Sequence, residues 1–200
     1  MILIDPAIQT TFGRTLRRRE LTAFLREAQQ SAGLRGSVSL LLTGDDHIRQ
    51  LNRDFRRKNK PTDVLSFPAP EIPGLKPGLK SAPVGDLAIS VETAARQADG
   101  LGHPLASELK ILTLHGLLHL AGYDHETDSG EMARKEALLR KRLGLASGLI
   151  ERTANGHAPI KQSPEKQSPT KQAKKQPAKI SRPAQKSTVR QGTARKSAAR

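Results

Sequence analysis

The 200-residue chain contains no cysteine. Without thiolates it can form no disulfide framework and no thiolate nucleophile, so any transition-metal site must use histidine and carboxylate ligands. It also has no tryptophan and one tyrosine, and no apolar run approaches the roughly 20 residues of a membrane span. The N-terminus lacks the basic start and long apolar stretch of a signal peptide. These absences favour a reduced, cytoplasmic protein without a membrane segment.

Acidic residues are scarce: 19 Asp and Glu stand against 34 Lys and Arg, which gives a formal net charge of +15. The imbalance is concentrated in residues 151–200, which hold 13 basic and 2 acidic residues and no Leu, Phe, Tyr or Trp. Such a segment cannot bury enough apolar surface to offset the entropy of ordering it. We predict a folded domain over residues 1–150, a basic, disordered low-complexity tail over residues 151–200, and a polyanionic partner.

Hydrophobic periodicity predicts short strands alternating with helices in the folded domain. Strands are expected over residues 1–4, 37–43, 63–67 and 86–90, and helices over residues 15–31, from Asp45 or Asp46 as a cap, from about 91 to 98, over 104–120 and over 128–142. The helix over 104–120 is apolar nearly all round, so we expect it at the centre of the domain. The predicted fold class is α/β (α+β), with a single small mixed β-sheet packed with helices around this buried helix.

Three of the six histidines lie within the eleven residues HGLLHLAGYDH, 115–125. His115 and His119 are four residues apart on the predicted central helix, so their rings project from one face. The helix ends at Gly122, and the chain then turns back to present His125. Three histidine ligands with an open fourth position are typical of catalytic zinc. Ordinary polar residues at a helix end are the alternative, but three of them on an apolar helix are costly to bury without a common partner.

The same spacing, H-x3-H-x5-H with a glycine seven residues after the first histidine, is that of the metzincin proteases. Those enzymes need a glutamate directly after the first histidine as general base. This chain has Gly116 there, which cannot move a proton and which we expect to leave room beside the metal. Peptide hydrolysis is therefore disfavoured, whereas phosphodiester cleavage, which depends above all on charge neutralisation, fits a metal without the glutamate.

The histidine stretch, followed by Met132, resembles the signature of the YbeY family of endoribonucleases, the bacterial rRNA maturation factors. LNRDFRRKNKPTDVLSFP at 51–68 is similar to the family's segment preceding its substrate groove, and GDLAIS at 85–90 is similar to its following strand. The resemblance covers roughly residues 30–145 and excludes the tail. It implies a single-strand-specific, metal-dependent endoribonuclease that acts in rRNA maturation, notably at the 3′ end of 16S rRNA, and in ribosome quality control.

The resemblance also implies roles for individual residues. His115, His119 and His125 would hold one zinc ion per chain, and Arg56 matches the family's functional arginine. The family usually has glycine after that arginine, where this chain has Arg57. The residue type independently supports Arg56 in catalysis, because a planar guanidinium binds two phosphate oxygens at once.

Further residues are weaker candidates for the site. The basic residues around Arg56 form a cationic strip suited to substrate binding: Arg53, Arg57, Lys58 and Lys60. A solvated surface is the alternative, because that is the usual place of a charge run. Asp86 at a strand start and Asp124 beside the third histidine are candidates for orienting a ligand by a hydrogen bond, although either also suits a turn.

The expected partners are ribosomal RNA and the small ribosomal subunit. The tail has no aromatic residues for base stacking, but its basic side chains can neutralise phosphates and give affinity without sequence specificity; a passive solubilising tail is the alternative. Two other functions stay open: a ribosome assembly factor whose zinc is structural, and a metzincin-like metalloprotease. Zinc is the metal expected for three histidines, although nickel or another divalent ion also fits them.

Overall fold

The structure is a computed structural model that describes residues 1–70 and 82–145. The chain divides into two units, Met1–Lys161 and Gln162–Arg200, and every described residue belongs to the first. The predicted tail over residues 151–200 lies outside the described residues. Among the described residues, none of the helices combines the length and apolar character needed to cross a bilayer.

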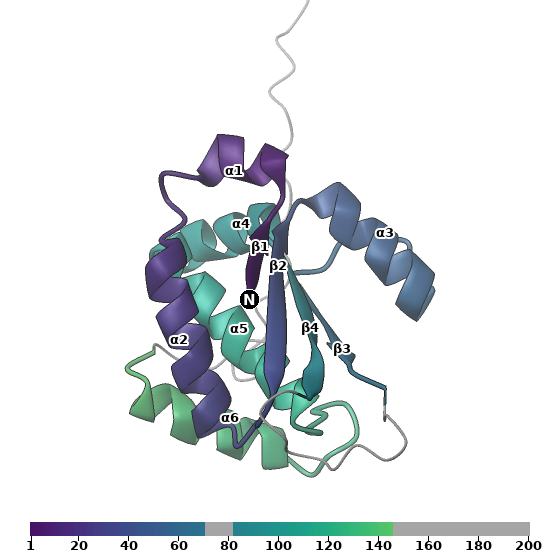
Figure 1. Cartoon of the computed structure of the whole chain (residues 1–200), viewed down its shortest axis with the longest axis vertical. Helices are drawn as coiled ribbons and strands as arrows, with labels where there is room; N and C mark the ends of the chain where they lie inside the picture. Colours follow the sequence, from purple (N-terminus) through teal and green to yellow (C-terminus); the bar gives the residue numbers. More distant parts are fainter. Residues whose placement is uncertain (71–81, 146–200) are drawn as a thin grey trace, which may run out of the picture. The chain divides into compact units, whose positions relative to one another are not determined.

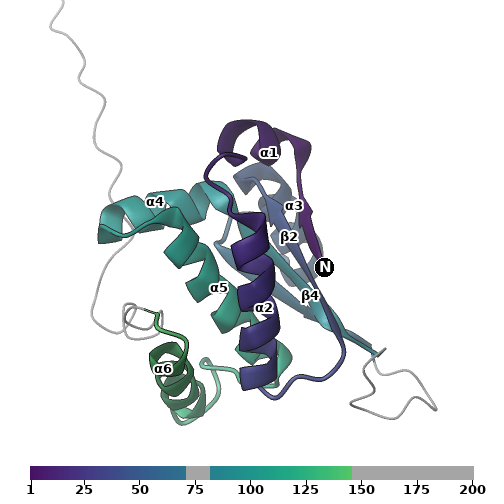
Figure 2. The ribbon, with the colours of Figure 1, turned by 60° about the vertical axis from the view of Figure 1, so that its left-hand side comes forward.

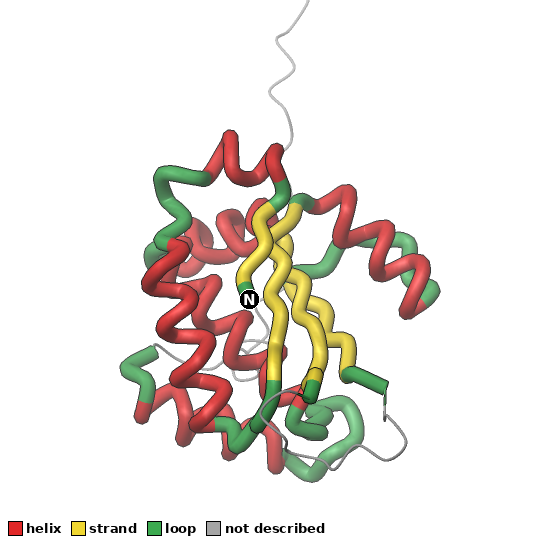
Figure 3. The backbone as a smooth tube through the Cα atoms, viewed as in Figure 1, coloured by secondary structure: helices red, strands yellow, loops and turns green. Residues whose placement is uncertain are grey.

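A four-stranded mixed sheet forms the framework of the first unit, in the order β1-β2-β4-β3. Its strands are β1 (Ile2–Ile4), β2 (Ser37–Thr43), β3 (Val64–Pro68) and β4 (Pro83–Ser90). β1, β2 and β4 are parallel to one another, and β3 runs antiparallel to β4 at the edge of the sheet (Figure 3). All four predicted strands are confirmed.

Six helices accompany the sheet in the described ranges. They are α1 (Pro6–Phe12), α2 (Arg18–Ser31), α3 (Asp45–Arg56), α4 (Val91–Leu101), α5 (Leu105–Leu120) and α6 (Glu131–Arg142). Figure 1 shows α2, α4, α5 and α6 on one side of the sheet and α3 on the other, and Figure 2 shows α2 and α5 lying along the sheet. This arrangement confirms the predicted fold class.

The central position of α5 is the main structural feature behind the site. Ten of its residues are buried, from Glu108 to Leu118, including the fully buried Leu112, Leu114, Leu117 and Leu118. It packs against α2, α4 and α6 and against β3 and β4. Burial of so many leucines, at roughly 1.5–3 kcal/mol each, fixes this helix as the rigid element on which the histidines are mounted.

The helices differ from the sequence prediction at α1 and in some bounds: α2 begins at Arg18 and α6 at Glu131, each three residues later than expected. α1 was not predicted, because its short apolar pattern follows directly from Asp5-Pro6, which reads equally as a strand end; Pro6 instead opens the helix. α4 continues through Gly100 and ends at Leu101, where Gly102 takes the left-handed conformation with φ +69°. A glycine within a helix is tolerated when the following residues continue the pattern.

Asp45 does not cap α3, contrary to the prediction. Gly44 is the residue before the helix, and the Asp45 carboxylate instead accepts hydrogen bonds from the hydroxyls of Ser90 and Thr93 and from the Arg96 guanidinium, the last at 2.7 Å. Burial acts to raise the pKa of Asp45, but these three donors outweigh it and the pKa is lowered. The cluster ties the start of α3 to the start of α4 and so holds α3 beside the sheet.

Candidate metal centre and cationic cleft

The three histidines of residues 115–125 meet at the C-terminal end of α5. The ring centroids of His115 and His119 are 4.9 Å apart, and the His125 ring lies 5.3 Å and 5.4 Å from them. One nitrogen from each ring can be chosen so that all three lie within 4.8 Å of one another. Imidazoles so placed, on a helix end and on the turn that Gly122 allows with φ +87°, fit a divalent ion.

A buried carboxylate orients the first histidine. Nδ1 of His115 lies 3.0 Å from Oε2 of Glu136 on α6, and both side chains are almost completely buried. With a carboxylate as partner this nitrogen is the donor, which leaves Nε2 as the metal-binding atom. Oε1 of the same carboxylate accepts a hydrogen bond from Arg140 at 3.2 Å. Glu136 therefore fixes both the tautomer and the ring orientation of His115.

Glu136 was missed at the level of sequence, although a signal exists. The buried residues of α6 are Met132, Glu136, Leu139 and Arg140, so a carboxylate and a guanidinium interrupt its apolar face. A buried carboxylate without a partner is very costly, so such a residue implies a buried basic group opposite it. Nothing in the sequence says which of the basic groups that would be, because α5 and α6 are joined by a turn of irregular conformation.

The surroundings of His119 favour its neutral form, and hydrogen bonds hold the turn that follows it. Burial lowers the pKa of His119, and the neighbouring His115 and His125 lower it further. The neutral imidazole is the form that binds a metal, so this environment favours ligation. Asp124 is half-buried, and its Oδ1 and Oδ2 accept from the Glu126 backbone N–H and the Thr127 hydroxyl. The backbone hydrogen bond is the largest cause of the lowered pKa of Asp124, and these two hydrogen bonds hold the turn.

The histidine cluster opens into a cleft of about 900 Å³. One wall comes from the C-terminal end of α3 and the loop after it, the other from the turn after α5, and the edge strand β3 runs between them. All three histidines line this cleft, together with Arg56, Lys58 and Lys60. The structure thus brings the predicted metal ligands and the predicted catalytic arginine into one space, although they are more than 50 residues apart in the chain.

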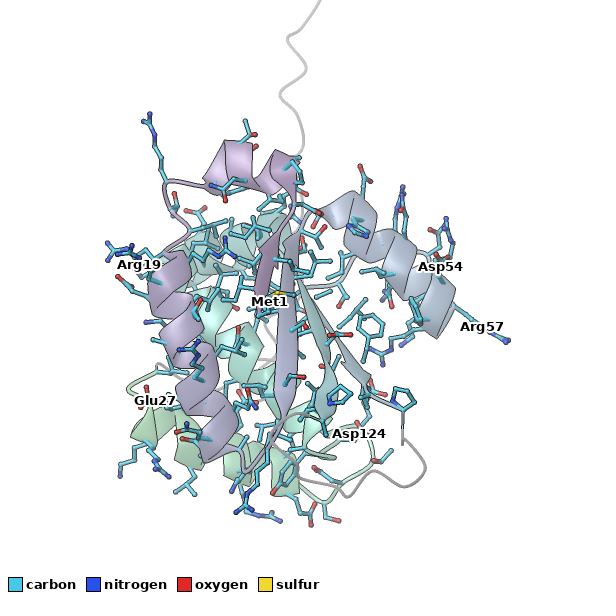
Figure 4. All side chains as sticks on the ribbon, in the orientation of Figure 1. Met1, Arg19, Glu27, Asp54, Arg57 and Asp124 are labelled. Atoms are coloured by element: carbon cyan, nitrogen blue, oxygen red, sulfur yellow. The ribbon has the colours of Figure 1, made fainter. Side chains whose placement is uncertain are left out.

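The basic strip divides into a part that lines the cleft and a part that does not. Arg53 is outside the lining; its Nε donates to Asp54 at 2.8 Å, and both side chains are more than half exposed. Arg57 is also outside it and extends from the end of α3 away from the rest of the domain (Figure 4). Of the weaker candidates for substrate binding, Lys58 and Lys60 therefore face the site, and Arg53 and Arg57 do not.

The backbone explains why Arg57 points away. With φ +58° it is the one non-glycine residue of the described ranges in the left-handed region, and it ends α3 by donating its N–H to the Arg53 carbonyl oxygen. This is the position at a helix end where glycine is common, and the reversal of direction separates Arg57 from Arg56. The two arginines are thus not interchangeable in this structure.

Asp86 is not placed to orient a ligand histidine, contrary to the prediction. Ser66 on β3 donates a hydrogen bond to the Gly116 carbonyl oxygen of α5 at 3.2 Å, so this face of the sheet is turned toward α5. Leu87 is opposite Ser66 in the ladder and shares that face. Because side chains alternate along a strand, Asp86 projects from the other face, where it is exposed. The carboxylate that meets a ligand histidine is Glu136.

Gly116 has a different role from the one expected. A Cβ built at this position would lie 2.8 Å from Cδ2 of Leu87 and 3.2 Å from Oγ of Ser66, so it would point into the packed sheet and not toward free space beside a metal. The glycine permits the close approach of α5 to β3 and β4. A glutamate here could not reach the histidine cluster without displacing the sheet, which removes the geometric basis for a metzincin-like base.

Gly116→Ala is expected to destabilise the protein by about 1–3 kcal/mol, because the added methyl group overpacks the contact with buried Leu87. Chemical denaturation of the full chain measures the loss. Ser107→Ala, nearer the start of the same helix and only partly buried, is the matched control and should change stability little. A Gly116→Ala protein as stable as the parent would show that the helix and sheet are not in such close contact.

Glu136→Gln is expected to weaken metal affinity about 10- to 100-fold, because the amide can still accept from His115 but no longer polarises the ring. Competition with a chelator of known affinity measures the change. Glu131→Gln, on an exposed position of the same helix, should leave the affinity unchanged. Equal affinities of the parent and the Glu136→Gln protein would contradict the orienting role of this carboxylate.

The chain is similar in sequence to known proteins. The family model described as "Endoribonuclease YbeY" matches residues 7–144. An "Endoribonuclease YbeY" of Koribacter versatilis is 52% identical over 135 residues, which cover 68% of this chain and 83% of the relative. One of Nautilia profundicola is 50% identical over 115 residues, covering 58% and 78%. A protein of Thermotoga maritima solved in solution is 26% identical with a TM-score of 0.46, covering 81% of this chain and 100% of that one.

The family match spans more than half of the chain and includes α3, β3, α5 and α6, the elements that form the cleft and the histidine cluster. The Koribacter relative is similar over most of its own length. The chain therefore belongs to the YbeY family of endoribonucleases.

Proposed function

We propose that this protein is a metal-dependent endoribonuclease that hydrolyses single-stranded RNA with one zinc ion per chain. The observation that carries the proposal is the meeting of three histidines with Arg56, Lys58 and Lys60 in one cleft. Histidines alone are compatible with many metal sites. Their combination with cations and an open cleft suits a polyanionic substrate whose cleavage develops further negative charge.

The donor set fits zinc, because neutral imidazoles are ligands that it prefers and a carboxylate orients one of them. When bound, zinc would supply a Lewis acid for the scissile phosphate and lower the pKa of a water toward ~7. The chain's own residues then have separate tasks. The three histidines would hold the ion, and Glu136 fixes the orientation and tautomer of the His115 ring. The Arg56 guanidinium binds phosphate oxygens and stabilises the negative charge that develops on them.

The proposed substrate is ribosomal RNA on the small subunit, with action at the 3′ end of 16S rRNA and in ribosome quality control, in the cytoplasm. The support is the family membership, the cationic wall of the cleft and the net charge of +15. A metalloprotease is disfavoured because a side chain at position 116 would point into the sheet and not toward the metal ligands. A non-catalytic assembly factor makes the same contacts with RNA, so only a cleavage assay separates it from an enzyme.

The test is cleavage of an end-labelled single-stranded RNA by the full chain, before and after chelation and after zinc is returned. We expect product formation to stop on chelation and to recover with stoichiometric zinc. A duplex of the same sequence should be cut far more slowly. Undiminished cleavage after complete metal removal would overturn the metal-dependent mechanism, and binding without products under every condition would favour the assembly factor.

Deletion of residues 152–200 is expected to weaken RNA binding and to reduce its dependence on salt, while the described fold and metal binding stay intact. The deleted segment holds all 13 basic residues that follow position 150, and each phosphate contact it makes would release counterions. Affinity for single-stranded RNA across a salt series measures the effect. Equal affinities of the two proteins at low salt would show that the segment does not bind RNA.

A further inference from the structure

Phe55 has the exposure of a binding residue and not of a core residue. It follows Ile48 and Asn52 on one face of α3, and both of those side chains are buried. Phe55, one turn further on, is 67% exposed, whereas Phe24 is 6% exposed. The exposed ring lies at the end of α3 that forms a wall of the cleft. The chain has only four phenylalanines, and this one contributes little to the core.

A second aromatic residue fixes the position of this ring. Phe67 on β3 lies with its ring centroid 5.0 Å from that of Phe55, at an interplanar angle of 68°. Such an edge contact is a favoured aromatic geometry. It leaves most of the Phe55 ring exposed to solvent. Both rings line the cleft that contains the histidines.

The charges beside the aromatic pair are suited to a nucleic-acid strand. Arg56 is the next residue to Phe55, and Lys58 and Lys60 line the same wall. Asp54 is paired with Arg53 outside the cleft. Asp63 lines the cleft, but its carboxylate accepts hydrogen bonds from the Val64 backbone N–H and the Gln97 side chain, and Asp124 and Glu126 line the opposite wall. Cations that follow a phosphate backbone, with an aromatic ring between them, form the usual recognition surface for single strands.

We propose that Phe55, supported by Phe67, stacks on one base of the RNA strand in the cleft while Arg56 binds a phosphate near that base. The inference rests on the proposed ribonuclease function and adds to it a contact with a base. A ring can stack in this way only on a base whose face is accessible, as in a single strand. Phe55 is thus a positioning residue that favours unpaired RNA, and the protein selects it by stacking in addition to charge.

The test is a double-mutant cycle that pairs two proteins with an intact RNA and a series of abasic RNAs. Full-length, zinc-loaded parent and Phe55→Ala proteins bind a ten-nucleotide single-stranded RNA, and the same RNA with an abasic site placed at each position in turn. Dissociation constants come from stopped-flow fluorescence of 2-aminopurine in the strand, read before product accumulates. We expect Phe55→Ala to weaken binding of the intact RNA by about 5- to 150-fold, the range for loss of one stacked base.

One abasic position should weaken binding to the parent by the same factor and have no added effect on Phe55→Ala, because both changes remove the same contact. Phe55→Trp should bind at least as well as the parent. The matched control is Leu138→Ala, which removes a side chain 63% exposed on α6 and should bind like the parent. Unchanged binding by Phe55→Ala, or equal losses on intact RNA and on every abasic RNA, would overturn the proposal.

This outcome is independent of the cleavage assay, because stacking is read from binding before products form. A protein that cleaves normally but shows no coupling between Phe55 and any base would refute the stacking contact alone. A protein that shows the coupling but never cleaves would refute the ribonuclease function and leave the contact in place.

Discussion

Replacing His119 by alanine is expected to lower cleavage of single-stranded RNA by about 10³-fold or more and to remove the bound metal. His119 supplies one of the three rings, and its centroid lies 4.9 Å and 5.4 Å from those of His115 and His125. Two remaining imidazoles would hold a divalent ion weakly. The metal's stabilisation of transition-state charge, worth several kcal/mol, would be lost with it.

The matched control for this change is His47→Ala. His47 is 44% exposed at its side chain, lies on α3, and its Nδ1 is 3.1 Å from Oδ2 of Asp5, away from the cluster. It should keep both metal and activity. Thermal unfolding monitored by circular dichroism confirms that each variant is folded. A His119→Ala protein that cleaves at the parent rate under the same zinc concentration would contradict the catalytic role of the centre.

Arg56→Ala is expected to slow cleavage by about 10²- to 10³-fold while zinc content stays the same. The guanidinium lines the cleft but is not among the groups that can hold the ion, so its loss removes phosphate stabilisation without releasing the metal. The magnitude is that of removing one donor to a developing oxyanion. Single-turnover cleavage rates and metal analysis of the same preparation measure the two quantities together.

Arg57→Ala is the control. It removes the same charge at the next residue, and the Arg57 side chain points out of the cleft. Its effect on the cleavage step should be small. Arg56→Lys should recover little, since an ammonium cannot bind two phosphate oxygens in the guanidinium geometry. Equal losses from Arg56→Ala and Arg57→Ala would mean that the arginine acts only through net charge.

Local patterns were sufficient to predict the central elements. The strand runs and the leucine-rich helix have strong periodicity, and the three histidines lie within one helix and its terminal turn, so their meeting is set by short-range geometry. These features depend on few contacts between distant segments, which is why the sequence is informative about them. Arg56 was singled out differently, by the resemblance to the family's arginine and by the ability of a guanidinium to bind two phosphate oxygens.

The features that were missed depend on tertiary packing. Glu136 reaches His115 only because α6 packs against α5, and Asp86 is excluded because the register of β3 with β4 turns it to the other face. The tight contact of Gly116 with Leu87 is likewise invisible in the sequence, where a glycine reads as open space. Each of these required the relative placement of elements, which hydrophobic periodicity does not specify.

The most direct test of the central claim is the metal stoichiometry of the intact protein by native mass spectrometry, for the parent and for His115→Ala, His119→Ala and His125→Ala. The account predicts one divalent ion bound to the parent and its loss, or a large loss of affinity, in each of the three variants. Full retention of the ion in any of them, or a parent that binds none when zinc is supplied, would contradict the three-histidine centre.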